Sequence, residues 1–78
     1  MITMYGTQTC SDCARARTYF DDHAVEYTDI DVSDNAEAMA KVIDYNDGRS
    51  SVPVVVFPDG THLTEPSNDE LAAKLAAS

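Results

Sequence analysis

The sequence predicts an α/β fold with the element order β-α-β-α-β-β-α. Three observations lead to this order. A Cys-x-x-Cys pair lies between a short β-prone segment and a helix-forming segment, the densest apolar run occupies residues 52–57, and two later segments begin like helices with a capping box. These features predict a four-stranded mixed sheet with three helices. The 78 residues are enough for a single domain, so we expect residues 1–78 to form one.

The first half of the chain predicts a βαβ unit. Residues 2–5 are β-prone and end at a glycine, which is typical of a short buried strand. A helix is expected from residue 9 or 10 to about residue 23, and residues 25–32 are expected to form the second strand. A right-handed crossover would make the two strands parallel. Four residues near helical spacing should form the inner face of the helix: Cys13, Ala16, Phe20 and Ala24.

The second helix is expected to begin at residues 33 and 34. Asp34 and Glu37, three residues apart, resemble a capping box. Apolar residues then recur at i, i+3, i+4 and i+7, which predicts the buried face. That face would consist of Ala36, Met39, Ala40 and Ile43, and residues 46–48 would end the helix.

The last part of the chain predicts a hairpin and a third helix. Residues 51–57 are rich in β-branched side chains and suit a strand buried on both faces. A turn at residues 58–60 would lead into a return strand at 61–63. Ser67 and Glu70 form a second capping box, so the third helix should begin there. Two leucines on one face would dock it: Leu71 and Leu75.

Composition excludes several classes of partner. Five basic and fourteen acidic residues give a net charge of −9, whereas proteins that bind nucleic acid or anionic membranes carry clusters of Lys and Arg. No apolar run reaches the ~18 residues that a transmembrane helix needs. The first residues lack the basic start and long apolar core of a signal peptide. We therefore expect a monomeric, cytoplasmic protein.

The two cysteines, Cys10 and Cys13, are the candidate site. A structural disulfide between them would close a very small loop and would stabilise the fold little. Zinc needs four ligands, but His23 and His62 are far apart in sequence and no second cysteine pair exists, so no metal site is expected. A lone Cys-x-x-Cys pair between a strand and a helix instead indicates redox chemistry.

Position in the helix predicts different roles for the two sulfurs. The thiolate is the reactive form of cysteine, and Cys10 at the first helical turn would face unpaired N–H groups and the positive end of the helix dipole. Cys13, one turn later, should be more buried. We therefore expect Cys10 to attack an external disulfide and Cys13 to resolve the mixed disulfide that results.

The chain also resembles glutaredoxins, and more narrowly the small bacterial mycoredoxins. The resemblance is carried by the strand, Cys-x-x-Cys and helix at the start, by Val52-Pro53 before a strand, and by the segment Asp59-Gly60-Thr61-x-Leu63-Thr64-x-Pro66-Ser67. That segment differs from the ribonucleotide-reductase redoxins, which carry a tryptophan there; this chain has none. The resemblance covers essentially the whole chain and implies a thioredoxin-like fold.

The resemblance implies a thiol–disulfide oxidoreductase. Its substrates would be disulfide-containing proteins, or proteins in mixed disulfides with a low-molecular-weight thiol of the mycothiol or glutathione type. The small thiol would be a co-substrate, and no cofactor would be tightly bound. A route that uses this thiol would need Cys10 but not Cys13.

The resemblance also implies binding residues. Pro53 would follow a cis peptide bond beside the cysteines and would leave the backbone of Val52 free to pair with a substrate. Gly60 and Thr61 match positions that bind the charged end of the small thiol. Arg49 could meet a carboxylate of that thiol, or could simply be a solvated loop residue.

One residue of the motif departs from the resembled family. Asp12 stands where relatives often carry an aromatic residue, and its charge opposes thiolate formation at Cys10. Arg15 and Arg17 would compensate if they pointed toward the sulfurs.

Three alternatives stay open. The protein could be a redoxin that the flavin enzyme thioredoxin reductase reduces directly. It could carry an iron–sulfur cluster held between two protomers by Cys10 and a bound thiol. It could also be a non-catalytic adaptor that retains an unused cysteine pair.

Overall fold

The computed structural model describes residues 1–77; Ser78, the last residue of the predicted domain, lies outside this part. The elements follow the predicted order. The strands are β1 (Ile2–Gly6), β2 (Tyr27–Asp31), β3 (Val54–Val56) and β4 (His62–Thr64), and the helices are α1 (Ser11–Asp22), α2 (Ala36–Tyr45) and α3 (Asn68–Ala77). Each helix within residues 1–77 lacks the length and apolar character that crossing a membrane requires.

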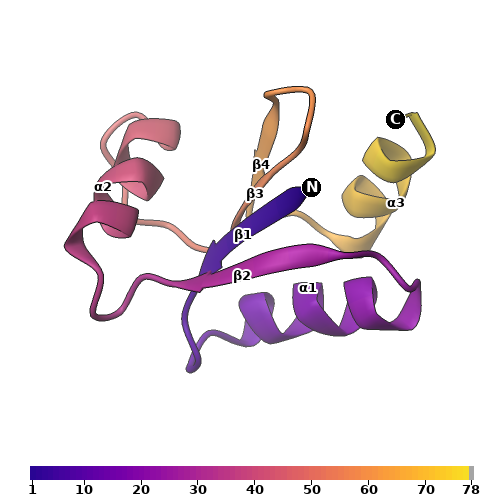
Figure 1. The fold of residues 1–78 in the computed structure, drawn as a ribbon, viewed down its shortest axis with the longest axis horizontal. Coiled ribbons are helices and arrows are strands. Elements are labelled where there is room, and N and C mark those ends of the chain that lie inside the picture. The colour runs from indigo at the N-terminus through magenta and orange to yellow at the C-terminus, as the bar shows by residue number, and fades with distance from the viewer. Residues whose placement is uncertain (78) are drawn as a thin grey trace.

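The strands form a mixed sheet in the order β2-β1-β3-β4. β1 runs parallel to β2 and antiparallel to β3, and β3 and β4 form an antiparallel hairpin. This confirms the predicted parallel pair and antiparallel edge. α1 and α3 pack on one face of the sheet and α2 packs on the other (Figure 1).

Alternation along the strands builds a separate apolar core on each face. In β1, Ile2 and Met4 pack toward α1 and α3, while Tyr5 packs toward α2. Val54 and Val55 divide in the same way in β3. Each large apolar side chain removed from water contributes about 1.5–3 kcal/mol, so both helical layers are held firmly to the central strands.

α1 ends before Ala24, which the sequence placed on its inner face. Ala24 is exposed and has a left-handed φ of 53°. The N–H of Val25 donates to the Phe20 carbonyl at 2.9 Å, which closes the helix end in the manner of a Schellman motif. The prediction for Ala24 is therefore wrong, because the chain turns away there. The other predicted inner-face residues are buried: Cys13, Ala16 and Phe20.

α2 begins one residue later than predicted. Asn35 is the N-cap, and its side-chain Oδ1 accepts the N–H of Ala38 at 3.0 Å. The predicted capping box of Asp34 and Glu37 is therefore wrong, because residues 33 and 34 form a turn before the helix starts.

The buried face of α2 also differs from the predicted one. Ala38 and Val42 are buried against the sheet, and Met39 is half-buried beside them. The other predicted members of the buried stripe are exposed: Ala36, Ala40 and Ile43. Alanines lie on both sides of this helix, so apolar spacing alone favoured the wrong side.

The limits of all four strands differ from the predicted ones, most clearly in β2 and β3. β2 is shorter than residues 25–32 because the N–H of Val25 bonds to the end of α1. β3 begins at Val54, after Pro53, which has no N–H to offer the sheet.

The third helix confirms its predicted capping box. Ser67 Oγ accepts the N–H of Glu70 at 3.1 Å, and Glu70 Oε1 accepts the N–H of Ser67 at 3.0 Å. Leu71 is fully buried and Leu75 is half-buried against the core, as the sequence predicted.

Gly6 at the end of β1 leaves room for α1. A Cβ atom added at Gly6 would lie 2.8 Å from Cys13 Sγ and 3.3 Å from Cys13 Cβ. Contacts this short do not occur between well-packed atoms, so the absence of a side chain lets the first turn of α1 lie against the strand.

We therefore expect Gly6→Ala to lower the free energy of unfolding by about 1–3 kcal/mol, because overpacking forces side chains and backbone to shift. Urea unfolding followed by circular dichroism measures the change. In a Cys13→Ala background the same substitution should cost less, since the sulfur that it meets is gone. An equal cost in both backgrounds would show that this contact is not the cause.

Candidate active site

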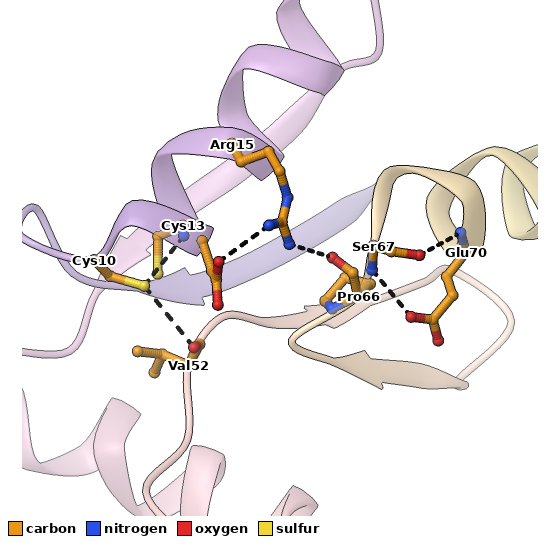
Figure 2. A network of polar contacts seen from close by, with 8 residues as sticks. Cys10, Cys13, Arg15, Val52, Pro66, Ser67 and Glu70 are labelled. Atoms are coloured by element: carbon orange, nitrogen blue, oxygen red, sulfur yellow. Dashed lines mark hydrogen bonds and ion pairs between the residues drawn. The ribbon is translucent and has the colours of Figure 1, made fainter.

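Cys10 is the N-cap of α1. Its backbone is extended (φ −88°, ψ 119°), and its Sγ accepts the N–H of Cys13 at 3.1 Å (Figure 2). Sulfur here takes the place of the oxygen that a Ser, Thr or Asp cap usually supplies. The half-exposed sulfur of Cys10 is therefore held at the helix N-terminus, where backbone N–H groups face it.

Cys13 lies behind Cys10 and is fully buried. Burial raises the pKa of the Cys13 thiol to about 11, and its hydrogen bond with Cys10 adds to the rise. The backbone N–H of Thr7 and the charge of Arg17 lower the pKa of the same thiol, but by less. Both cysteines are free thiols. The structure therefore holds one accessible sulfur and one buried, protonated sulfur side by side.

The Val52-Pro53 peptide bond is cis, as the sequence predicted, and Pro53 is buried. The loop brings the carbonyl of Val52 to 3.9 Å from Cys10 Sγ, a long contact for a thiol donor (Figure 2). Within residues 1–77 no other group bonds to the backbone of Val52. Its N–H and C=O are thus available beside the accessible sulfur.

Arg15 pairs with Asp12 rather than pointing at a sulfur. Its Nη1 lies 3.1 Å from Asp12 Oδ1, and its Nη2 donates to the Pro66 carbonyl at 3.0 Å (Figure 2). The charge of Asp12 is therefore partly balanced by Arg15, and α1 is tied to the start of α3. The sequence did not indicate Pro66 as a partner, because a backbone carbonyl 51 residues away leaves no mark in the local pattern.

The guanidinium of Arg17 and the sulfur of Cys13 both lie near Gly6. Its Nε donates to Asp29 Oδ2 at 2.7 Å, and its Nη2 donates to the Thr7 carbonyl at 3.0 Å. Sequence reasoning named Arg17 but missed Asp29, which the parallel pairing of β1 and β2 places opposite Met4.

Gly60 and Thr61 are not brought to the cysteines. β3 pairs with β1 so that Val54 lies opposite Tyr5 and Val56 opposite Thr3. The turn after β3 therefore lies beyond the N-terminal end of β1, whereas the cysteines lie at its C-terminal end. Asp59 holds this turn through bonds to Thr61. Binding of a small thiol by Gly60 and Thr61 stays a prediction, and their position in the fold does not support it.

Arg49 is exposed on the loop that leads to Val52, within the same connection between α2 and β3. Its role as a carboxylate contact also stays a prediction. Across residues 1–77 no three His, Cys, Asp or Glu side chains gather in a way that could hold a metal ion.

Comparison with known proteins gives a consistent result. The glutaredoxin family model matches residues 2–63. Mycoredoxin 1 of Corynebacterium glutamicum is 40% identical over 76 residues, which cover 97% of this chain and 94% of the relative. The crystal structure of a glutaredoxin from Archaeoglobus fulgidus superposes with a TM-score of 0.80 at 28% identity, covering 95% of this chain and 84% of the other.

The glutaredoxin-like NrdH-redoxin of Escherichia coli has the same fold, with a TM-score of 0.76 at 22% identity over 92% of this chain and 91% of the other. The thioredoxin-like fold predicted from the sequence is confirmed. With the match to the family model and the close relative, this chain belongs to the glutaredoxin family of thiol–disulfide oxidoreductases.

Proposed function

We propose that the protein reduces disulfides and mixed disulfides of other proteins, with Cys10 as the nucleophile and Cys13 as the resolving thiol. The observation that carries the proposal is the difference between the two sulfurs. Cys10 is accessible at the N-terminus of α1, and Cys13 is fully buried directly behind it. Only Cys10 can meet an external sulfur, and only Cys13 is close enough to displace what Cys10 has captured.

The reaction proceeds in two exchanges. The Cys10 thiolate attacks one sulfur of the substrate disulfide, a new S–S bond forms, and the other substrate sulfur leaves as a thiolate. Cys13 then loses its proton to solvent and attacks Cys10 Sγ. The Cys10–substrate bond breaks, the second substrate sulfur leaves and takes up a proton, and the protein is left with a Cys10–Cys13 disulfide.

The backbone of Val52 would orient the substrate. Its N–H and C=O are free of other partners in residues 1–77, and the carbonyl already lies beside Cys10 Sγ. An extended substrate segment could pair with both groups, which would set its sulfur near Cys10 without selecting its sequence. Disulfide-containing or thiolated proteins are therefore the proposed partners, and the protein would act as a monomer.

A low-molecular-weight thiol of the mycothiol or glutathione type is the proposed co-substrate. When Cys10 attacks a protein–small-thiol mixed disulfide and keeps the small thiol, a second small thiol can free it. Arg49 remains the candidate contact for a carboxylate of that thiol. A reducing compartment is needed to regenerate the pair, so we place the activity in the cytoplasm.

We expect Cys10→Ser to lower the reduction of protein disulfides and of protein–small-thiol mixed disulfides by about a hundredfold or more. The reason is that a serine hydroxyl gives almost no anion at neutral pH. Cys13→Ser should keep the reduction of a protein–small-thiol mixed disulfide but lose the reduction of a protein disulfide. NADPH consumption in a coupled assay measures both. Retained activity in Cys10→Ser would exclude Cys10 as the nucleophile. Absence of both activities in the unaltered protein would instead favour an adaptor with an unused cysteine pair.

The choice of reductant is tested on the unaltered protein. We expect turnover of one model mixed disulfide with mycothiol or with glutathione, each supplied with its own reductase, and little turnover with thioredoxin reductase alone. NADPH oxidation is compared at equal thiol concentrations. Turnover with thioredoxin reductase alone, and with neither small thiol, would contradict the proposed co-substrate and would identify a redoxin reduced directly by the flavin enzyme.

A further inference from the structure

Arg17 is fixed in place beside the buried cysteine. Its guanidinium donates to Asp29 on β2 at 2.7 Å and to the Thr7 carbonyl at 3.0 Å. Only 16% of the Arg17 side chain is exposed, compared with 43% for Arg15, whose pair with Asp12 lies at the surface. An arginine that is covered and bonded at two points keeps one orientation, because its planar fork matches both acceptors.

The guanidinium and the Cys13 sulfur border the same small space. A Cβ atom added at Gly6 would lie 2.8 Å from Cys13 Sγ and 3.6 Å from Arg17 Nη2. Water screens charges poorly in such a covered place, so a cation there acts on the sulfur more strongly than a surface cation would.

Thr7 connects the two residues a second time. Its backbone N–H lowers the pKa of the Cys13 thiol, and its carbonyl accepts from Arg17. Arg17 therefore fixes the carbonyl of Thr7, and the N–H of the same residue stabilises a negative charge on Cys13. Both the Thr7 N–H and the charge of Arg17 lower the pKa of Cys13, against the effect of burial.

Few titratable groups surround this pair. Cys10 acts on Cys13 from the start of α1 and disfavours its ionisation. Three groups on β2 interact with Arg17: Asp29, Tyr27 and Asp31. Asp29 offsets part of the guanidinium charge, but it also fixes its position.

We propose that Arg17 is a positioning residue for the second exchange: it holds Thr7 against Cys13 and presents a positive charge to the sulfur, so that Cys13 can ionise and displace the substrate from Cys10. This inference rests on the proposed roles of Cys10 and Cys13. The exchange keeps the same balance of bonds and protons, since Arg17 forms no covalent bond and neither gives nor accepts a proton.

A single-turnover reaction with the aryl disulfide 5,5′-dithiobis(2-nitrobenzoate) separates the two exchanges. The reduced full-length protein is mixed in slight excess over the disulfide. Attack by Cys10 releases the first coloured thiolate, and attack by Cys13 on the mixed disulfide releases the second. The two rates are followed from pH 6 to pH 10 in the wild type and each variant.

We expect Arg17→Gln, which removes the charge and keeps a hydrogen-bonding side chain, to leave the first release nearly unchanged. The second release should slow, and its pH profile should move to higher pH. Each unit of pKa rise lowers the thiolate fraction tenfold but raises its intrinsic reactivity by about threefold, so the net loss is about threefold per unit. Arg17→Lys should restore the pH profile and only part of the rate, since an ammonium group cannot reproduce the fork to Thr7 and Asp29.

Lys41→Met is the matched control, because it removes one positive charge from the exposed side of α2. It should change neither release. A second release in Arg17→Gln with wild-type rate and pH profile would overturn the inference, as would a profile in Arg17→Lys that moves as far as in Arg17→Gln. If Arg17→Gln does not fold, Arg17→Lys alone decides. A second release as fast as that of the wild type in Arg17→Lys would overturn the role given to the two hydrogen bonds of the Arg17 guanidinium.

The proposed function fails in a different way. If the wild type releases no first thiolate, or if Cys10→Ser still releases it, then Cys10 is not the nucleophile and both proposals fall. If the first release depends on Cys10 but the second is insensitive to Arg17, only the role of Arg17 is excluded.

Discussion

The close contact between Cys13 and the backbone of Gly6 is the constraint on which the site depends. The face of α1 that packs on the sheet consists of Cys13, Ala16 and Phe20. The absence of a side chain at Gly6 lets the first turn of that helix lie against β1. Cys10 lies one turn earlier on the same side of the helix, at the N-cap, where this side reaches the end of α1 and is half-exposed. The two sulfurs are therefore neighbours that differ in accessibility.

Each of two arginines near the cysteines bonds to one carboxylate and one backbone carbonyl, but the two differ in their effect on the thiols. Arg15 bonds to Asp12 and to the Pro66 carbonyl, and Arg17 bonds to Asp29 and to the Thr7 carbonyl. An exposed ion pair such as that of Arg15 contributes only about 0–1 kcal/mol, so its main effect is to neutralise Asp12 within the motif. The pair of Arg17 is more covered and lies against a buried sulfur, where a charge has chemical consequences. In a chain with a net charge of −9, Arg17 is the cation whose charge lowers the pKa of Cys13.

Structural features that depend on the spacing of nearby residues could be predicted from the sequence. Features that depend on how distant segments are oriented in the fold could not. The Ser67 capping box and the cysteine pair at a helix start depend on spacing alone, and the structure has both. Residues 33–35 are three consecutive residues of types that cap helices, so the sequence did not show that Asn35 would be the N-cap of α2. The binding role of Gly60 stays a prediction from a matching motif. Its distance from the cysteines was not predictable, because it depends on the direction in which β3 runs along β1. The pairing of Arg17 with Asp29 depends on the register of β1 and β2, which no local pattern encodes.

The chemistry of the buried sulfur changes with the state of its neighbour. In the reduced protein the hydrogen bond with Cys10 and the charge that Cys10 can carry both raise the pKa of Cys13, in addition to burial. When Cys10 enters a mixed disulfide, its sulfur no longer carries a proton or a negative charge, so these two influences end. The N–H of Thr7 and the charge of Arg17 remain and continue to favour the thiolate of Cys13. In the proposed mechanism, the resolving thiol would thus become easier to ionise only after the first exchange. The burial that keeps Cys13 away from solvent would then also set the order of the two proposed steps, because Cys13 lies beside Cys10 at the start of α1.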